Sequence, residues 1–155
     1  MGKYFGTDGI RGKYGEKLDE ALAYKTGLAL GGFYGGGKFV LGRDTRISGE
    51  EIENALVRGI TDMGGEVLLL GILPTPAVAM LAIKHGAKCG VMISASHNPP
   101  EYNGIKVFDG NGVKLGEEQE GSIEYYIDNL PSVTGGGKVE KKDGAKREYI
   151  DYLVS

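Results

Sequence analysis

A short polar segment, residues 94–98, holds the side chains best suited to chemistry. It follows an apolar run, residues 91–93, that predicts a buried strand, and it breaks into a loop of small and turn-forming residues. Asn103–Gly104 is a dipeptide typical of a turn. The chain then returns through residues 105–108, a predicted strand in which Lys106 is the one cation. A hydroxyl, an imidazole and an amide therefore lie at the carboxyl end of a predicted strand, with an ammonium returning beside them. In open α/β sheets that end of the strands is where ligands bind.

Ser96 has two chemical interpretations and one structural one. As a hydrolase nucleophile it would need an orienting base and an oxyanion hole, and neighbouring side chains on an extended segment point apart, which disfavours a pair with His97. As a phosphate carrier it would need positive charge and donors around the phosphate, which Lys106, His97 and backbone N–H groups could supply. A structural role, in which Ser96 and Asn98 satisfy backbone groups of a turn, is equally favoured on the residues alone.

Four segments of the sequence resemble the first domain of the α-D-phosphohexomutases. The segment SASHNPPEYNGIKVF at 94–108 resembles the phosphoserine loop of that family. FGTDGIRG at 5–12, GRDTRISG at 42–49 and PTPAVAML at 74–81 match other parts of the same domain. FGTDGIRG is similar to the opening of the branch that acts on glucosamine phosphate.

The resemblance implies a mutase reaction that passes through a bisphosphate. Phosphorylated Ser96 would give its phosphoryl group to O1 of glucosamine 6-phosphate. The 6-phosphate of the resulting 1,6-bisphosphate would then return to Ser96, leaving glucosamine 1-phosphate. Two alternatives stay open: a mannose or glucose phosphate as substrate, and a non-catalytic stand-alone domain retained for binding or oligomerisation.

The resemblance also implies roles for seven residues. The expected catalytic residues are Ser96, His97, Lys106 and Arg11, and the expected phosphate or loop support is Asn98, Thr7 and Asp8. Without the resemblance, Arg11 would be interpreted as a solvated residue of a flexible N-terminal turn.

Several partners follow from the same resemblance. Mg²⁺ is expected to bind the phosphate on Ser96 together with aspartates of a second domain, and a glucose- or glucosamine-1,6-bisphosphate type of activator is expected. The other expected partners are a phosphosugar substrate and the remaining domains of a longer enzyme, and a homodimer is compatible with the family. The isolated chain is expected to be inactive.

Two arginines of the segment 42–49 stay outside the expected catalytic set. Arg43 and Arg46 could attract an anion, but an Arg–Asp pair bracing their own loop explains them equally well. Ser48 and Glu51 have the spacing of a capping box at the start of a helix, which gives them a structural role.

The elements around these residues alternate between strands and helices. Periodic apolar residues predict helices at 18–34, about 52–63, about 76–85, 117–130 and 145–154. Short apolar runs predict strands at 38–41, 66–70, from residue 89 to 93, and 105–108, with a hairpin turn at 109–112 and an edge strand at 113–115. Thr75 is expected to cap its helix, and His85 is expected as a residue of the last turn of that helix, favoured by the helix dipole. We therefore expect a three-layer α/β/α sandwich with a mixed, mostly parallel sheet and one antiparallel hairpin near its edge.

The domain organisation expected from the resemblance is a single phosphohexomutase domain 1 over residues 1–155. Within it, residues 131–144 are interpreted as a polar linker, and the whole segment 131–155 as a linker and helix leading toward an absent second domain.

Composition restricts the function further. The net charge of −3 and the 25% of charged residues give no basic field for nucleic acid. No run of apolar residues is long enough to span a bilayer, and no secretory segment is present. The single cysteine, Cys89, lies in an apolar run and predicts a reduced, cytoplasmic setting. No G-x-G-x-x-G after a strand, G-x-S-x-G or Walker sequence occurs.

Overall fold

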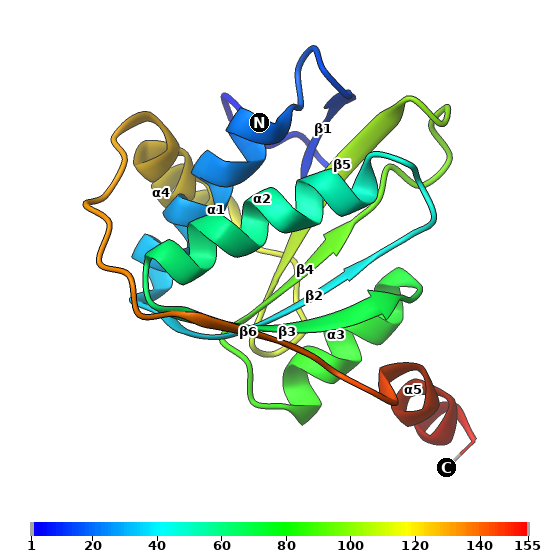
Figure 1. The fold of residues 1–155 in the computed structure, drawn as a ribbon. Helices are drawn as coiled ribbons and strands as arrows, with labels where there is room; N and C mark the ends of the chain where they lie inside the picture. The colour runs from blue at the N-terminus through cyan, green and yellow to red at the C-terminus, as the bar shows by residue number, and fades with distance from the viewer. Residues whose placement is uncertain (1, 155) are drawn as a thin grey trace.

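Six strands form one sheet that helices cover on both faces (Figure 1). The computed structural model describes residues 2–154. The strands are β1 (Ile10–Lys13), β2 (Gly37–Arg43), β3 (Gly65–Ile72), β4 (Cys89–Ile93), β5 (Tyr102–Asp109) and β6 (Lys138–Lys141). The helices are α1 (Glu20–Tyr34), α2 (Gly49–Asp62), α3 (Thr75–Lys84), α4 (Glu117–Asp128) and α5 (Ala145–Leu153). The expected three-layer α/β/α sandwich is confirmed.

The sheet has the order β1-β5-β4-β2-β3-β6. The pairs β4–β2, β2–β3 and β3–β6 are parallel, whereas β5 is antiparallel to both of its neighbours, β4 and β1. Helices α1, α2 and α4 lie on one face of the sheet, and α3 and α5 lie on the other (Figure 1). The sheet is thus mixed and mostly parallel, as expected.

The central strands are buried on both faces, which explains their uninterrupted apolar runs. All five residues of β4 are buried. On β2, Phe39 and Leu41 pack into the core beneath α1 and α2, while Val40, between them, packs into the core beneath α3. Each such side chain contributes about 1.5–3 kcal/mol when it is fully buried, so the middle of the sheet is a rigid base for the loops at its carboxyl end.

Two expected helix caps are absent. Ser48 precedes α2 but makes no side-chain cap bond, since its backbone is already in the right-handed helical region and not in the extended one that a cap needs. Its hydroxyl accepts a hydrogen bond from Nδ2 of Asn103 at 2.9 Å. Glu51 accepts from the Tyr14 hydroxyl at 2.6 Å instead of closing a capping box. At α3, Thr75 is the first helical residue and Pro74 the cap, with no side-chain cap bond. Ser48 and Glu51 thus both bind partners distant in sequence.

The antiparallel part of the sheet differs from the expected hairpin. The dipeptide Asn103–Gly104, expected as a turn, lies inside β5, where Gly104 pairs with Arg11 of β1. The expected edge strand at 113–115 is reduced to a single bridge between Phe108 and Lys114. Because β1 occupies the edge beside β5, the glycine-rich segment 5–12 is brought into the sheet.

The C-terminal segment is more ordered than a linker. Residues 138–141, expected within a loop, form β6 and pair in parallel with β3. On α5, Glu148 is 2.7 Å from Lys84 Nζ, 3.2 Å from Lys142 Nζ and 3.1 Å from Nε2 of His85. His85, expected only as a last-turn residue of its helix, thus contacts α5 directly.

The cluster around Glu148 lowers the pKa of this carboxyl to about 2, chiefly through its hydrogen bond with Lys84. Because the pKa is lower in the folded state, the stabilisation is present above the ordinary value of 4.5 and is lost as the pH falls toward about 2. The carboxylate therefore holds α5 on α3 throughout the neutral range.

Helices α1 and α2 pack closely because Gly59 has no side chain. A Cβ at this position would lie 2.4 Å from the carbonyl oxygen of Tyr24 and 2.6 Å from the amide nitrogen of Leu28. Both atoms belong to the backbone of α1, so they cannot move aside without moving the helix.

We expect Gly59→Ala to lower the free energy of unfolding by about 1–3 kcal/mol, the usual cost of overpacking. Chemical denaturation of the chain measures it. Gly121→Ala is the matched control, because no atom lies within 4 Å of a Cβ there and alanine should gain up to about 1 kcal/mol in a helix. Equal effects of the two substitutions would contradict the close helix crossing.

Candidate active site

Ser96 lies just beyond the carboxyl end of β4, and each of its polar groups has a partner. Its amide donates to the Ser94 hydroxyl at 3.0 Å, and its carbonyl accepts from the Arg46 guanidinium at 2.8 Å. Its hydroxyl accepts from Nη2 of Arg11 at 3.2 Å and from Nζ of Lys106 at 3.4 Å. The side chain of an exposed residue is therefore held in one place, with two cations beside its oxygen.

The backbone of Ser96 is in the left-handed region, with φ of 53°. Among non-glycine residues at 2–154, no other has a positive φ. This conformation costs a non-glycine residue on the order of 1–3 kcal/mol, and such residues cluster at functional sites. Because Ser96 is left-handed, the chain turns at Ser96 and His97. The extended segment assumed for these two residues in the sequence analysis is therefore not formed.

Arg11 and Lys106 reach Ser96 from two adjacent strands. Arg11 is on β1, opposite Gly104, and Lys106 is on β5, opposite Met92 of β4. The Lys106 ammonium is directed at the Ser96 hydroxyl, 3.4 Å away. Nε of Arg11 is buried without a hydrogen-bond partner.

Arg46 binds the serine loop with its whole guanidinium group. Its Nε donates to Asp44 at 3.3 Å, which confirms the Arg–Asp pair expected in this segment. Its four other N–H donors are directed at backbone carbonyl oxygens of the loop, at 2.8 Å (Ser96), 2.9 Å (Asn98), 2.7 Å (Pro99) and 2.9 Å (Tyr102). A residue that the sequence assigned to its own loop thus organises a loop fifty positions away.

The other expected site residues lie around this centre with different degrees of contact. His97 is exposed, and within residues 2–154 its ring joins no hydrogen bond or ion pair. Asn98 supports the loop through its backbone, since its amide donates to the Ala95 carbonyl at 3.0 Å. The Thr7 carbonyl accepts from Nζ of Lys114.

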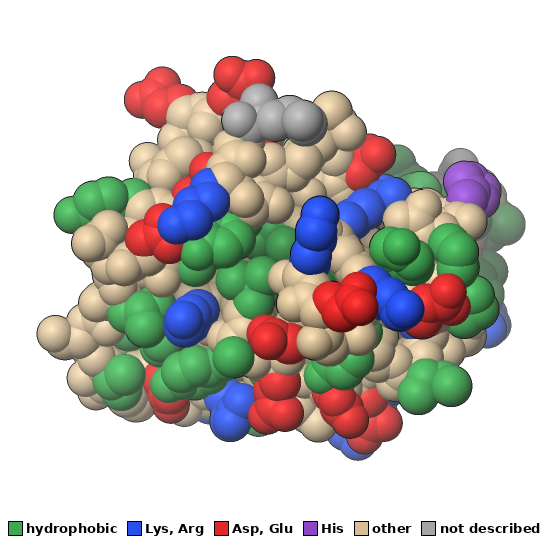
Figure 2. Space-filling view, turned by 90° about the horizontal axis from the view of Figure 1, so that it is seen from above, with side chains coloured by type: hydrophobic (Ala, Val, Ile, Leu, Met, Phe, Trp, Pro, Cys, Tyr) green, Lys and Arg blue, Asp and Glu red, His purple; other side chains and the backbone are tan. Residues whose placement is uncertain are grey.

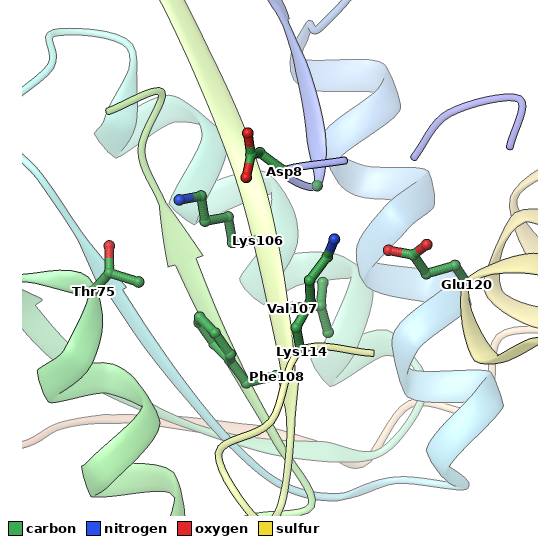
Figure 3. Close-up of a pocket in the computed structure, with 8 residues that line it drawn as sticks. Asp8, Thr75, Lys106, Val107, Phe108, Lys114 and Glu120 are labelled. Carbon is green, nitrogen blue, oxygen red and sulfur yellow. The ribbon is translucent and has the colours of Figure 1, made fainter. Parts of the chain in front are cut away.

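Asp8 lines a cavity of about 180 Å³ beside the serine loop (Figure 3). Lys106 and Lys114 also line it, and Val107 and Phe108 contribute apolar surface. Glu120 of α4 lies at its far side, and burial raises the pKa of that carboxyl. Two ammonium groups and two carboxyls therefore line the cavity, and Lys106 connects it to Ser96.

Two residues with clear contacts to the site were missed in the sequence. Ser94 had no assigned role, yet its hydroxyl accepts the Ser96 amide. The i, i+2 spacing of a serine and a backbone N–H is the signal that could have found it. For Arg46 the sequence carries no such signal, because its acceptors are carbonyl groups distant in sequence.

The described residues do not hold a complete metal site. No group of three or more His, Cys, Asp or Glu side chains suited to a metal occurs among residues 2–154.

The helices within residues 2–154 are all too short or too polar to span a membrane. Acidic and basic side chains alternate over the face in Figure 2, which shows no broad basic surface.

Comparisons with known proteins converge on one family. The family model for phosphoglucomutase/phosphomannomutase, alpha/beta/alpha domain I, matches residues 2–133. Phosphoglucosamine mutase from Clostridioides difficile (strain 630) is 50% identical over 165 residues, which cover 100% of this chain and 37% of the relative. Phosphoglucosamine mutase from Thermotoga maritima is 58% identical over 127 residues, covering 82% of this chain and 29% of the relative.

A solved structure gives the same result for the fold. The crystal structure of a phosphoglucomutase/phosphomannomutase family protein from Burkholderia thailandensis aligns with a TM-score of 0.84 and 31% identity. The alignment covers 97% of this chain and 35% of that chain. The matched segments therefore span between 29% and 37% of the lengths of these relatives.

The strain at Ser96 can be measured separately from its hydroxyl. We expect Ser96→Gly to be more stable than Ser96→Ala by about 1 kcal/mol, because glycine adopts a positive φ without a steric cost. Urea denaturation of both variants gives the difference. At Ser94, where φ is not positive, we expect the alanine variant to be more stable than the glycine variant. If glycine were the more stable substitution at both positions, the left-handed geometry of Ser96 would be contradicted.

Proposed function

Because the chain belongs to the phosphoglucomutase/phosphomannomutase family, as its alpha/beta/alpha domain I, we propose that it is the serine-bearing domain of a phosphoglucosamine mutase. The names of its relatives, at about half identity, support the sugar. The observation that carries the proposal is the Ser96 hydroxyl, held between Arg11 and Lys106 at the carboxyl end of β4. The domain would occupy residues 1–155, with 131–155 leading toward a second domain.

In the proposed reaction, phosphorylated Ser96 reacts with glucosamine 6-phosphate. The bond between phosphorus and Oγ breaks as a bond forms between phosphorus and O1 of the sugar, and the O1 proton is transferred to Oγ, which gives a free Ser96 hydroxyl and the 1,6-bisphosphate. The bisphosphate turns over within the site. The bond between its second phosphorus and O6 then breaks as a bond forms to Oγ, whose proton passes to O6, and glucosamine 1-phosphate is left. A 1,6-bisphosphate activator would phosphorylate Ser96 initially.

Charge around the phosphoryl group is what this chain supplies. Arg11 and Lys106 would contact the equatorial oxygens, whose negative charge needs stabilisation during transfer. His97 is exposed beside Ser96 and is free to meet a substrate, while Asn98, Thr7 and Asp8 would support the loop and the phosphate.

A magnesium ion would supply further positive charge at the phosphate when bound. This chain would hold it through a phosphate oxygen on Ser96, which suits an ion that binds phosphates together with one or two carboxylates. The remaining ligands would come from another domain, because residues 2–154 contain no suitable acidic cluster.

A mannose or glucose phosphate is the second candidate for the substrate. The family model is named for phosphoglucomutases and phosphomannomutases, and the geometry around Ser96 recognises a phosphoryl group, not a particular sugar.

A cytoplasmic location is consistent with the buried, unpaired Cys89.

The carrier role predicts a covalent phosphate on Ser96. In the full-length enzyme, Ser96→Ala should reduce turnover of glucosamine 6-phosphate to background, with little loss of stability. Ser94→Ala should retain the phosphate on Ser96 but turn over more slowly, because the Ser96 amide loses its acceptor. Phosphopeptide mass spectrometry and a coupled assay measure both; phosphate on Ser94, or an active Ser96→Ala enzyme, would exclude the mechanism.

The two cations predict the acidity of the phosphate. Free phosphoserine has a second pKa of about 6, and nearby positive charge lowers the pKa of an acid. With phosphoserine installed at position 96, we expect the pKa from a ³¹P NMR titration to lie below 6. Lys106→Met should raise it and reduce kcat of the full-length enzyme by about 10²–10³-fold.

Lys88→Met is the control for that titration, since Lys88 donates to the Tyr34 carbonyl far from the loop. It should leave the phosphate pKa unchanged. If Lys106→Met also left the pKa unchanged, Lys106 would have no electrostatic role at Ser96.

A further inference from the structure

We propose that Arg46 is a positioning residue for phosphoryl transfer: by binding the backbone carbonyls of the serine loop, it holds Ser96 in the left-handed turn that places the hydroxyl between Arg11 and Lys106. The inference rests on the proposed carrier role of Ser96. It adds a residue that acts through the loop, because its guanidinium binds the Ser96 carbonyl and not the Ser96 hydroxyl.

The first argument is the number of hydrogen bonds. A guanidinium has five N–H donors in a rigid planar fork. In Arg46, four of them are directed at loop carbonyls and the fifth at Asp44, so every donor has an acceptor. Lysine has only three donors and no planar fork, so it could not reproduce this set.

The second argument is burial. The Arg46 side chain is only 10% exposed, and Asp44 is the one carboxylate paired with it. A cation of this kind is stable only when it is well paired. Here the carbonyl dipoles of the loop supply most of that compensation, so the loop and the arginine stabilise one another.

The third argument is the direction of the loop carbonyls. A left-handed residue turns its carbonyl away from the course of an extended chain, and the Ser96 carbonyl points to Arg46 while its hydroxyl faces Arg11 and Lys106. Arg46 holds the carbonyl oxygens on one side of the loop, so their partial negative charges do not face the side on which a phosphate would lie. Without Arg46, the left-handed turn would no longer be held, and the carbonyl groups could rotate toward the phosphate.

The experiment uses the 155-residue chain with phosphoserine installed at position 96. Loop mobility is measured by amide hydrogen exchange over residues 95–103, and the phosphate environment by a ³¹P pH titration. Because the phosphate is installed during synthesis, the result does not depend on whether the enzyme phosphorylates Ser96 by itself. Failure of this inference is therefore distinguishable from failure of the proposed mutase activity.

Arg46→Met should speed exchange of the loop amides at least tenfold while α1 keeps its protection. It should also raise the phosphate pKa toward that of an Arg11→Met/Lys106→Met chain. Arg46→Lys should shift both readouts in the same direction, although it keeps the charge. The matched control is Arg58→Met, since Arg58 lies on α2 and pairs only with the exposed Glu20 and the Tyr24 ring; it should change neither readout.

A purely structural role predicts a different pattern. Arg46→Met would then lower the unfolding midpoint while leaving the phosphate pKa and the loop exchange as in the parent chain, and that outcome overturns the proposal. If Arg46→Met does not fold, Arg46→Lys and Asp44→Asn carry the test. An unchanged phosphate pKa in both of those variants would overturn it as well.

Discussion

The antiparallel pairing of β5 with both β4 and β1 is the constraint on which the site depends. β4 delivers Ser96 to the carboxyl edge of the sheet, and β5 runs back beside it, so that Lys106 lies opposite Met92, four residues before Ser96. β1 then pairs with the other side of β5 and places Arg11 opposite Gly104. An all-parallel arrangement would send the returning strand through a crossover connection of a dozen or more residues, and the short serine loop could not close over the site.

Gly104 shows how closely these strands depend on one another. A Cβ at this position would lie 2.7 Å from the carbonyl oxygen of Ser94 and 2.9 Å from Cγ of Arg11. The missing side chain leaves the space in which the stem of Arg11 crosses β5 to reach Ser96. The glycine that suggested a turn in the sequence is therefore needed in a strand, because a side chain must pass over it.

The sequence was sufficient to predict the layers of the fold, because they depend on local patterns, and apolar runs identified the buried strands. For the candidate site, the resemblance at the serine loop pointed to Ser96 and Lys106, whose Oγ and Nζ atoms lie 3.4 Å apart in the structure. Other features depend on contacts between distant segments. The strand at 138–141 is mostly charged, and each of its residues is exposed; it forms by pairing with the edge of β3. The acceptors of Arg46 are likewise unrelated to its neighbours in sequence, so no local pattern could reveal them.

The arrangement separates two requirements that conflict in a phosphate-carrying loop. Under the proposed function, the serine would have to be exposed to meet a substrate, while its oxygen would have to stay between two cations during transfer. Exposed loops are usually mobile, and a left-handed serine adds a conformational cost of its own. Here the restraint comes from beneath the loop, through Arg46 and the amide acceptor Ser94, so the outer surface at Ser96 and His97 remains open. The serine loop is thus held through its backbone groups. The side chains of Ser96 and His97, which would face the substrate, are not needed to hold the loop.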